Sequence, residues 1–287
     1  AYEIKECDWS SDVCSSDLLN IVGNGMGSGM IEQNVDDMEV APTAEVAAKH
    51  KDVIVGIKSA HFSGAGWAPY ERAVAVGKQV GIPVMIDFGS AQRNNRTLQE
   101  LFEKYLRPGD IYTHVYSGLR KEQDPVTHGA AAAMLQGRRK GIWFDVGHGG
   151  ASFAWAVAVP MMKSGFLPDS ISTDLHTGSM NAGMKDMANV MSKILNLGAP
   201  LEEVIKMSTW NPAKQIKHPE LGNLDEGAEA DIAVFALEKG KFGFIDSAGA
   251  SFHGDKRLTA ELTIRAGRVV WDLNGRAAPD WKSFKYQ

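Results

Sequence analysis

The sequence predicts an α/β fold, in which a parallel sheet is covered by helices on both faces and is followed by a small antiparallel β unit. Short runs rich in β-branched residues recur from residue 19 onward, and amphipathic helical patterns lie between them. Near the C-terminus the pattern changes to alternating apolar and polar residues, which is typical of half-buried strands. Hydrophobic residues make up 44% of the chain and charged residues 23%, as expected of a globular protein.

Six runs are predicted to form parallel strands, because each is apolar and ends in Gly or a polar residue. They cover residues 19–23, 53–59, 84–89, 111–118, 141–147 and 170–175. Helical patterns occur between them, at residues 44–50, 69–80, 98–106 and 153–163. Two further helices, at 185–197 and 201–207, are predicted to follow the last strand.

The C-terminal tail is predicted to form four antiparallel strands, at residues 230–237, 241–246, 258–267 and 268–273. We place the change from the α/β part to the β part between residues 213 and 222. The predicted domains are therefore residues 19–215 and residues 216–287.

Residues 1–18 are treated separately, because the segment DWSSDVCSSDL at residues 8–18 is polar and non-periodic. It resembles one reading frame of a short-read sequencing adapter, and we interpret it as a non-native remnant. The alternative is a genuine Ser- and Asp-rich loop. We therefore expect that the natural N-terminus, with any signal peptide, is not in this sequence.

Charge and composition exclude several classes of partner. With 30 basic and 35 acidic residues, the formal net charge is −5, so we expect neither nucleic acid nor an anionic membrane surface as a partner. No apolar run approaches the ~20 residues of a membrane span. The two cysteines, Cys7 and Cys14, cannot build a disulfide framework. We expect a cytoplasmic protein.

Charged and imidazole side chains stand at the ends of five successive predicted strands. They are Lys58, Asp87, His114, His148 and Asp174, with His176 two residues beyond. In parallel α/β folds the carboxyl ends of the strands build the reactive site, and charged groups there are costly unless they are paired or metal-bound. The pattern therefore predicts a metal or acid–base centre. Oxygen and nitrogen donors without cysteine favour Zn²⁺, with Mn²⁺ as an alternative.

The strings VGIKSAH, RPGDIYTHVYSG, FDVGHGG and LPDSISTDLH resemble the amidohydrolase superfamily, specifically its deacetylase-like branch near dihydroorotase. Asn211-Pro212-Ala213 and the following LGNLDEGAEADIAVF resemble the end of that superfamily's barrel. The resemblance covers residues 19–275. It implies a (β/α)8 TIM-type barrel that holds one or two divalent ions and hydrolyses an amide or ester.

The resemblance also implies roles for individual residues. Lys58 matches the lysine that becomes a carbamate bridging two metal ions, and His114 matches a metal-ligating histidine. Asp174 matches the aspartate that contacts one metal and accepts the proton of the nucleophilic water, which makes it the catalytic residue.

Two departures from the family pattern stand out. Asp87 occupies the position of a ligating histidine, so it is interpreted either as a carboxylate ligand or as a residue that pairs with another charge. The His-x-His pair is absent together with the first two barrel strands. We therefore expect only about strands 3–8, a gap between the first and last of them, and no hydrolysis by this chain alone.

Four residues are predicted on the substrate side: His148, His176, Tyr116 and His61. For His148 the alternative is that it merely orients a metal ligand. The predicted function is metal-dependent deacylation of a small acylated molecule, with acetyl the expected acyl group. A cyclic-amide hydrolase of the dihydroorotase or hydantoinase type and a non-catalytic barrel scaffold stay open, as does a homo-oligomer.

Overall fold

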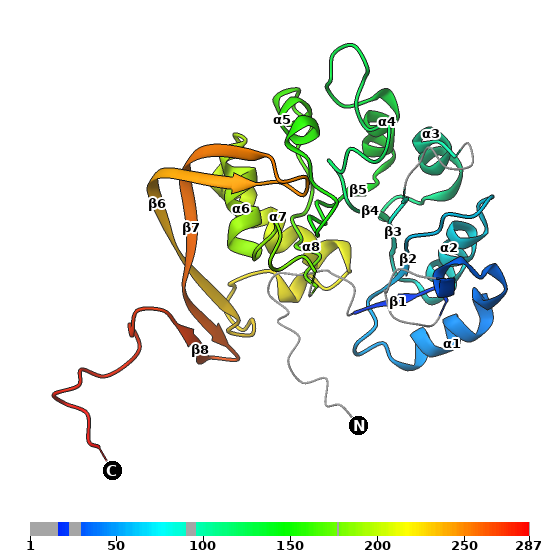
Figure 1. Ribbon diagram of the computed structural model, residues 1–287. Helices are drawn as coiled ribbons and strands as arrows, with labels where there is room; N and C mark the ends of the chain where they lie inside the picture. Colours follow the sequence, from blue (N-terminus) through cyan, green and yellow to red (C-terminus); the bar gives the residue numbers. More distant parts are fainter. Residues whose placement is uncertain (1–16, 23–29, 90–95, 177, 287) are drawn as a thin grey trace.

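A computed structural model describes residues 17–22, 30–89, 96–176 and 178–286 (Figure 1). Five short strands form one parallel sheet in the order β1-β2-β3-β4-β5. Their bounds are Leu18–Asn20 (β1), Gly56–Ser59 (β2), Val84–Ile86 (β3), Ile111–Tyr112 (β4) and Trp143–Phe144 (β5). This order confirms the predicted succession of parallel strands, although each strand is shorter than the apolar run that predicted it.

The sixth predicted strand, at residues 170–175, is not a strand in the structure, but this extended segment lies beside β5 and is joined to the chain after it by an isolated bridge and by backbone hydrogen bonds. Ser170 forms a parallel bridge with Asp145. The amides of His148 and Gly149 donate to the carbonyls of Ser172 and Thr173, at 3.2 and 2.8 Å. The segment therefore lies as a neighbour of β5.

The last two residues of the predicted non-native segment join the parallel sheet, and the origin of that segment stays a prediction. Residues 8–16 lie outside the described residues, but the carbonyl of Asp17 accepts a hydrogen bond from the Val55 amide. Leu18 opens β1 opposite Gly56 and is only 5% exposed. A Cβ on Gly56 would come within 2.6 Å of the Leu18 side chain, so the missing side chain makes room for Leu18. The sheet thus begins one residue before the predicted boundary at residue 19.

Helices follow the strands as predicted. In Figure 1 α2, α3, α4 and α5 form an arc outside the row of strands β2–β5. The first five helices are α1 (Val40–Lys49), α2 (Ala68–Val80), α3 (Leu98–Glu100, continued by a π-helix Leu101–Tyr105), α4 (Ala132–Lys140) and α5 (Trp155–Lys163). Then come α6 (Met187–Asn196), α7 (Leu201–Ser208) and α8 (Trp210–Gln215), with 3-10 turns at Met30–Gln33, Val35–Asp37 and Pro219–Leu221. In the described part of the chain, no helix is long and apolar enough to cross a membrane.

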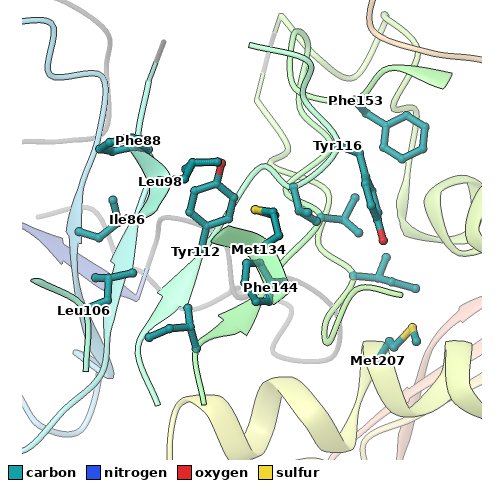
Figure 2. Close-up of a cluster of buried hydrophobic side chains, with 14 of the residues drawn as sticks. Ile86, Phe88, Leu98, Leu106, Tyr112, Tyr116, Met134, Phe144, Phe153 and Met207 are labelled. Atoms are coloured by element: carbon teal, nitrogen blue, oxygen red, sulfur yellow. The ribbon is translucent and has the colours of Figure 1, made fainter. Parts of the chain in front are cut away.

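The core between sheet and helices is rich in aromatic side chains (Figure 2). Phe102, Tyr112 and Phe144 contact each other edge to face, with ring centroids 5.3–5.8 Å apart. Such contacts add about 0.5–1.5 kcal/mol each to the stabilisation from burial. They anchor β4 and β5 and so hold the strand ends in place.

The C-terminal part is an antiparallel sheet of three strands, β6 (Ile232–Ile245), β7 (Ser251–Arg265) and β8 (Arg268–Asp272). The prediction of an antiparallel unit is confirmed, but the number of strands was wrong. Residues 230–237 and 241–246 belong to one long strand, because pairing with β7 continues through a register shift between Lys239 and Phe242. The division of the chain at residue 215 stays a prediction.

A hollow of about 880 Å³ lies between the two parts. It is lined by Leu18 of β1, by Thr173 and Leu175 of the sixth extended segment, and by Trp271 and Leu273 of the β unit. The hollow thus borders both the first and the last described barrel segments, and it includes the residues on either side of Asp174. That barrel strands are missing there stays a prediction.

Candidate active site

Four predicted site residues meet at the carboxyl ends of the parallel strands. Lys58 lies in β2, and Asp87 follows β3 directly. His114 lies two residues beyond β4, where its Nε2 is 3.6 Å from Oδ2 of Asp87. The charges of Lys58 and Asp174 also act on the His114 ring. The structure thus places Asp87 beside His114, with Lys58 and Asp174 near enough for their charges to act on the His114 ring. The functional roles of these residues stay predictions.

Asp87 forms a buried ion pair with Arg120, a residue that the sequence pattern missed. Nη2 of Arg120 and the amide of Gly89 both donate to Oδ1 of Asp87. Burial alone would raise the pKa of Asp87, but the charges of His114, Arg120 and His61 outweigh it and hold the pKa well below its ordinary value. Asp87 is therefore a carboxylate whose second oxygen, Oδ2, faces the histidines.

His114 is oriented by its backbone and by one hydrogen bond. Its φ of 63° lies in the left-handed region, which is uncommon outside glycine. Its Nδ1 donates to the carbonyl of Gly147 at 2.6 Å, so that Nε2 is directed at Asp87. Burial lowers the pKa of His114, although the charge of Asp87 opposes this effect. A neutral imidazole with a bonded Nδ1–H is the form that ligates metals through Nε2.

Asp174 is packed against the glycine-rich segment after β5. Its φ is 51°, and Gly149 beside it has a φ of 49°. A Cβ on Gly149 would collide with Oδ2 of Asp174. Only glycine therefore allows this approach of the backbone to the carboxylate.

Asp145 links the segments that carry the candidate site residues. The sequence analysis did not predict this residue. Hydroxyls of Thr113, Ser170 and Ser172 donate to its carboxylate at 2.7–2.8 Å. Burial raises the pKa of Asp145, although these three hydroxyls lower it in part. The bonds connect the segments that carry His114 and Asp174 to β5. This aspartate lay inside the predicted strand at residues 141–147, so the strand-end pattern gave no signal of this role, whereas in the structure β5 ends at Phe144 and Asp145 follows it directly.

His61, in the loop after β2, lies beside the carboxylate of Asp87. Its Nδ1 donates to Oε2 of Glu32 at 2.6 Å, and its Nε2 lies 3.5 Å from Oδ2 of Asp87. The hydrogen bond to Glu32 raises the pKa of His61, while burial lowers it. Glu32 is itself buried and accepts a bond from Asn20 at the end of β1. His61 therefore lies at the site, as predicted, whereas no pattern singled out Glu32.

Two of the residues predicted on the substrate side do not fit that role. Tyr116 is fully buried, donates to the carbonyl of Phe166 and contacts Phe153 edge to face, as Figure 2 shows. His148 is also fully buried, and both of its ring nitrogens bind protein groups, Lys193 and the carbonyl of Gly149. Neither offers a polar atom to a substrate. His176 is exposed and its ring lies near Gly150, so it keeps its predicted place at the rim.

The pKa of His148 leads to a prediction on stability. Burial and the charge of Lys193 lower this pKa to about 3, whereas an unfolded chain binds the proton near pH 6.5. The unfolded state alone gains a proton between these values, so the free energy of unfolding should fall by a few kcal/mol as the pH drops from about 6.5 towards 3. Urea denaturation at several pH values should show a flatter dependence for His148→Gln.

His253→Gln, at an exposed position on β7, is the control and should behave like the wild type. An unchanged pH dependence in His148→Gln would contradict this account of His148.

The fit of a metal ion to this site is partial. Among the residues that the structure describes, no three His, Cys, Asp or Glu side chains are grouped so that they could hold an ion. The pair formed by Asp87 Oδ2 and His114 Nε2 is nevertheless spaced at 3.6 Å. Two ligands of a tetrahedral zinc site are about 3.3–3.5 Å apart, given bond lengths of ~2.0–2.1 Å. The donors are oxygen and nitrogen, and Lys58 adds oxygens only if it is carbamylated.

Comparison with known proteins agrees with this description. The model of the amidohydrolase family matches residues 154–270. A deacetylase of Brucella anthropi is 34% identical over 223 residues, which are 76% of this chain and 54% of the relative. A deacetylase of Enterococcus faecalis is 30% identical over 227 residues, or 76% of this chain and 60% of the relative. The chain thus spans little more than half the length of these relatives.

Solved structures show the same fold. A dihydroorotase structure is 30% identical, with a TM-score of 0.75, and the match covers 88% of this chain and 70% of that one. An adenine deaminase structure is 26% identical, with a TM-score of 0.80, and the match covers 89% and 70%.

Proposed function

Because this chain belongs to the amidohydrolase family, we propose that it forms the larger part of a metal-dependent deacetylase that removes an acetyl group from a small N-acyl or O-acyl molecule. One observation carries the proposal. Asp87 and His114, which follow different strands, lie 3.6 Å from each other, and the charges of Lys58 and Asp174 act on the same His114 ring. The two relatives compared above are named deacetylases.

Each residue has a proposed part. Lys58 as a carbamate, His114, Asp174 and Asp87 through Oδ2 would hold one or two divalent ions, of which Zn²⁺ suits these donors and Mn²⁺ is the alternative. A bound ion would bring the pKa of a water molecule near 7. Asp174 would take the proton of that water and pass it to the leaving group.

Asp87 contributes charge and orientation. Its ion pair with Arg120 makes the two side chains neutral together, so Oδ2 can face a cation or the His114 ring without adding net charge to the site. His176, at the rim, would contact the substrate, and its Nε2–H suits a carboxylate or carbonyl oxygen of the substrate. Both ring nitrogens of His61 face protein carboxylates, Glu32 and Asp87, so His61 would instead help to orient Asp87.

A cyclic-amide hydrolase is the second candidate, because a dihydroorotase structure matches with a TM-score of 0.75 at 30% identity. The two candidates differ in the bond that is cleaved. An acetylated amine or alcohol releases acetate, whereas a cyclic amide opens without releasing a second product. Acetate release therefore distinguishes them.

The test uses a completed chain, in which the part of the Brucella anthropi relative that precedes the matched segment is joined ahead of Leu18. We expect it to bind about two divalent ions per chain and to release acetate from N-acetyl or O-acetyl compounds. Lys58→Ala should lose at least one ion and the activity. Lys163→Ala, at an exposed lysine on α5, is the matched control and should retain both.

Full metal content and activity in Lys58→Ala would contradict the carbamate role. A completed chain that binds metal but releases no acetate, while it opens cyclic amides, would favour the second candidate. A folded completed chain that does neither would favour a non-catalytic scaffold.

A further inference from the structure

Lys193 of α6 has no exposed surface, which is rare for a lysine. Its Nζ donates to the carbonyls of Gly183 and Ile245, each at 2.7 Å, and to Nε2 of His148 at 2.8 Å. Three acceptors match the three N–H bonds of an ammonium group. The lysine therefore connects α6, the end of β6 and the segment after β5.

These contacts determine which ring nitrogen of His148 carries the proton. A carbonyl oxygen only accepts, so Nδ1 of His148 must donate to Gly149, and in a neutral ring Nε2 is left to accept from Lys193. In a neutral ring the proton is then on Nδ1, which donates to the carbonyl of Gly149 at 2.9 Å. The ring also stacks on Phe153, with centroids 4.7 Å apart and an angle of 14° between the planes.

Gly149, whose carbonyl accepts the hydrogen bond from His148, also contacts Asp174. Its amide donates to the carbonyl of Thr173 at 2.8 Å, so the two segments are bonded directly before Asp174. Its Cα lies against the Asp174 carboxylate so closely that a side chain would collide with it. A hydrogen bond that holds the Gly149 carbonyl therefore also restrains the position of Asp174.

We infer that Lys193 is a positioning residue of the proposed hydrolytic site, which acts through His148 and Gly149 on Asp174. Since Ile245 supplies one of its three acceptors, the long hairpin of the β unit becomes part of the support of the site. This inference rests on the proposed function, in which Asp174 takes the proton of water.

An alternative interpretation is that Lys193 only attaches the β6–β7 hairpin to the barrel, and the other contacts of the hairpin argue against it. The turn between β6 and β7 has other bonds to the barrel: Asp246 accepts from the amide of Trp155, and Ser247 exchanges two hydrogen bonds with Phe153. These bonds do not involve Lys193, so its removal leaves the hairpin attached. The charges that act on Lys193 come from Asp246, Lys185 and Asp186, and burial lowers its pKa to about 7.

The first experiment measures the His148 tautomer in the 287-residue chain, labelled with ¹⁵N at histidine. The His148 signals are identified by their loss in His148→Gln. We expect a neutral ring with the proton on Nδ1 in the wild type. In Lys193→Met, whose unbranched side chain is one atom shorter and has no donor, we expect a mixture of tautomers and a titration nearer to pH 6.5. Lys163→Met is the matched control and should leave the spectrum unchanged.

The second experiment measures acetate release by the completed chain. Lys193→Met should lower kcat at least about tenfold with little change in KM. His148→Leu should match it, because both break the same connection. His148→Gln should retain activity within a few-fold of the wild type, since its amide can accept from Lys193 and donate to Gly149.

An unchanged His148 tautomer and titration in Lys193→Met would overturn the inference, as would an unchanged kcat. If Lys193→Met does not fold, the His148→Leu and His148→Gln pair decides: equal activity of the two overturns the inference, and rescue by Gln supports it. A wild-type completed chain without hydrolysis refutes the proposed function, and with it the positioning role of Lys193 in that site, while the labelled spectra still decide whether Lys193 controls the His148 tautomer.

Discussion

Alanine at Gly149 is expected to lower acetate release by the completed chain at least about 100-fold. The added Cβ would collide with Oδ2 of Asp174, and the φ of 49° is unfavourable for alanine. Asp174 must then move away from the place at which it takes the proton. Steady-state kinetics and the metal content of the purified variant measure this effect.

Alanine substitutions at two other glycines, Gly165 and Gly150, serve as controls that separate the collision with Asp174 from backbone strain and from a general effect of an added methyl group. Gly165 has a φ of 88° with nothing near its missing side chain, so Gly165→Ala reports backbone strain alone, about 1–3 kcal/mol of stability with kcat unchanged. Gly150 is the neighbour of Gly149, and its added Cβ would meet only atoms at 3.8 Å. A Gly149→Ala variant as active as Gly150→Ala would contradict the close approach to Asp174.

Removal of the Asp87 carboxylate is expected to destabilise the 287-residue chain by about 3–5 kcal/mol, because it leaves the buried Arg120 guanidinium without the carboxylate to which it donates, with only the charge of Glu122 still acting on it. The side chain of Arg120 is 1% exposed and that of Asp87 is 6% exposed. Urea denaturation of Asp87→Ala measures the loss. The double variant Asp87→Ala/Arg120→Met should recover much of it, because both charges are then gone.

Asp52→Ala, at an exposed position before β2, is the control for this comparison and should change stability by less than about 0.5 kcal/mol. Two results would contradict the stabilising role of the Asp87–Arg120 ion pair: a loss of stability below 1 kcal/mol in Asp87→Ala, or a double variant that is less stable than Asp87→Ala.

The sequence alone was sufficient for the succession of strands and helices, for the antiparallel C-terminal unit and for the family. Apolar runs that alternate with amphipathic helices have few other solutions. Parallel strands place their carboxyl ends at one edge, so Lys58, Asp87 and His114 could be assigned to one place before any contact was known. The two strands merged into β6 were misjudged because glycine and lysine residues at 239–241 look like a turn, although pairing with β7 carries the strand through them.

Only the tertiary structure decided what the candidate side chains face. The His148 ring is hydrogen-bonded to Lys193, 45 residues further along the chain. The Tyr116 hydroxyl donates to the carbonyl of Phe166, 50 residues further along. The carboxylate of Asp87 is paired with Arg120, 33 residues away, and Glu32 meets His61 across 29 residues. Local periodicity reports which face of a helix or strand is buried, but not which distant segment packs against it. A buried polar group must find its hydrogen-bond partner there, so whether a strand-end histidine serves a substrate or the protein itself is settled only by folding.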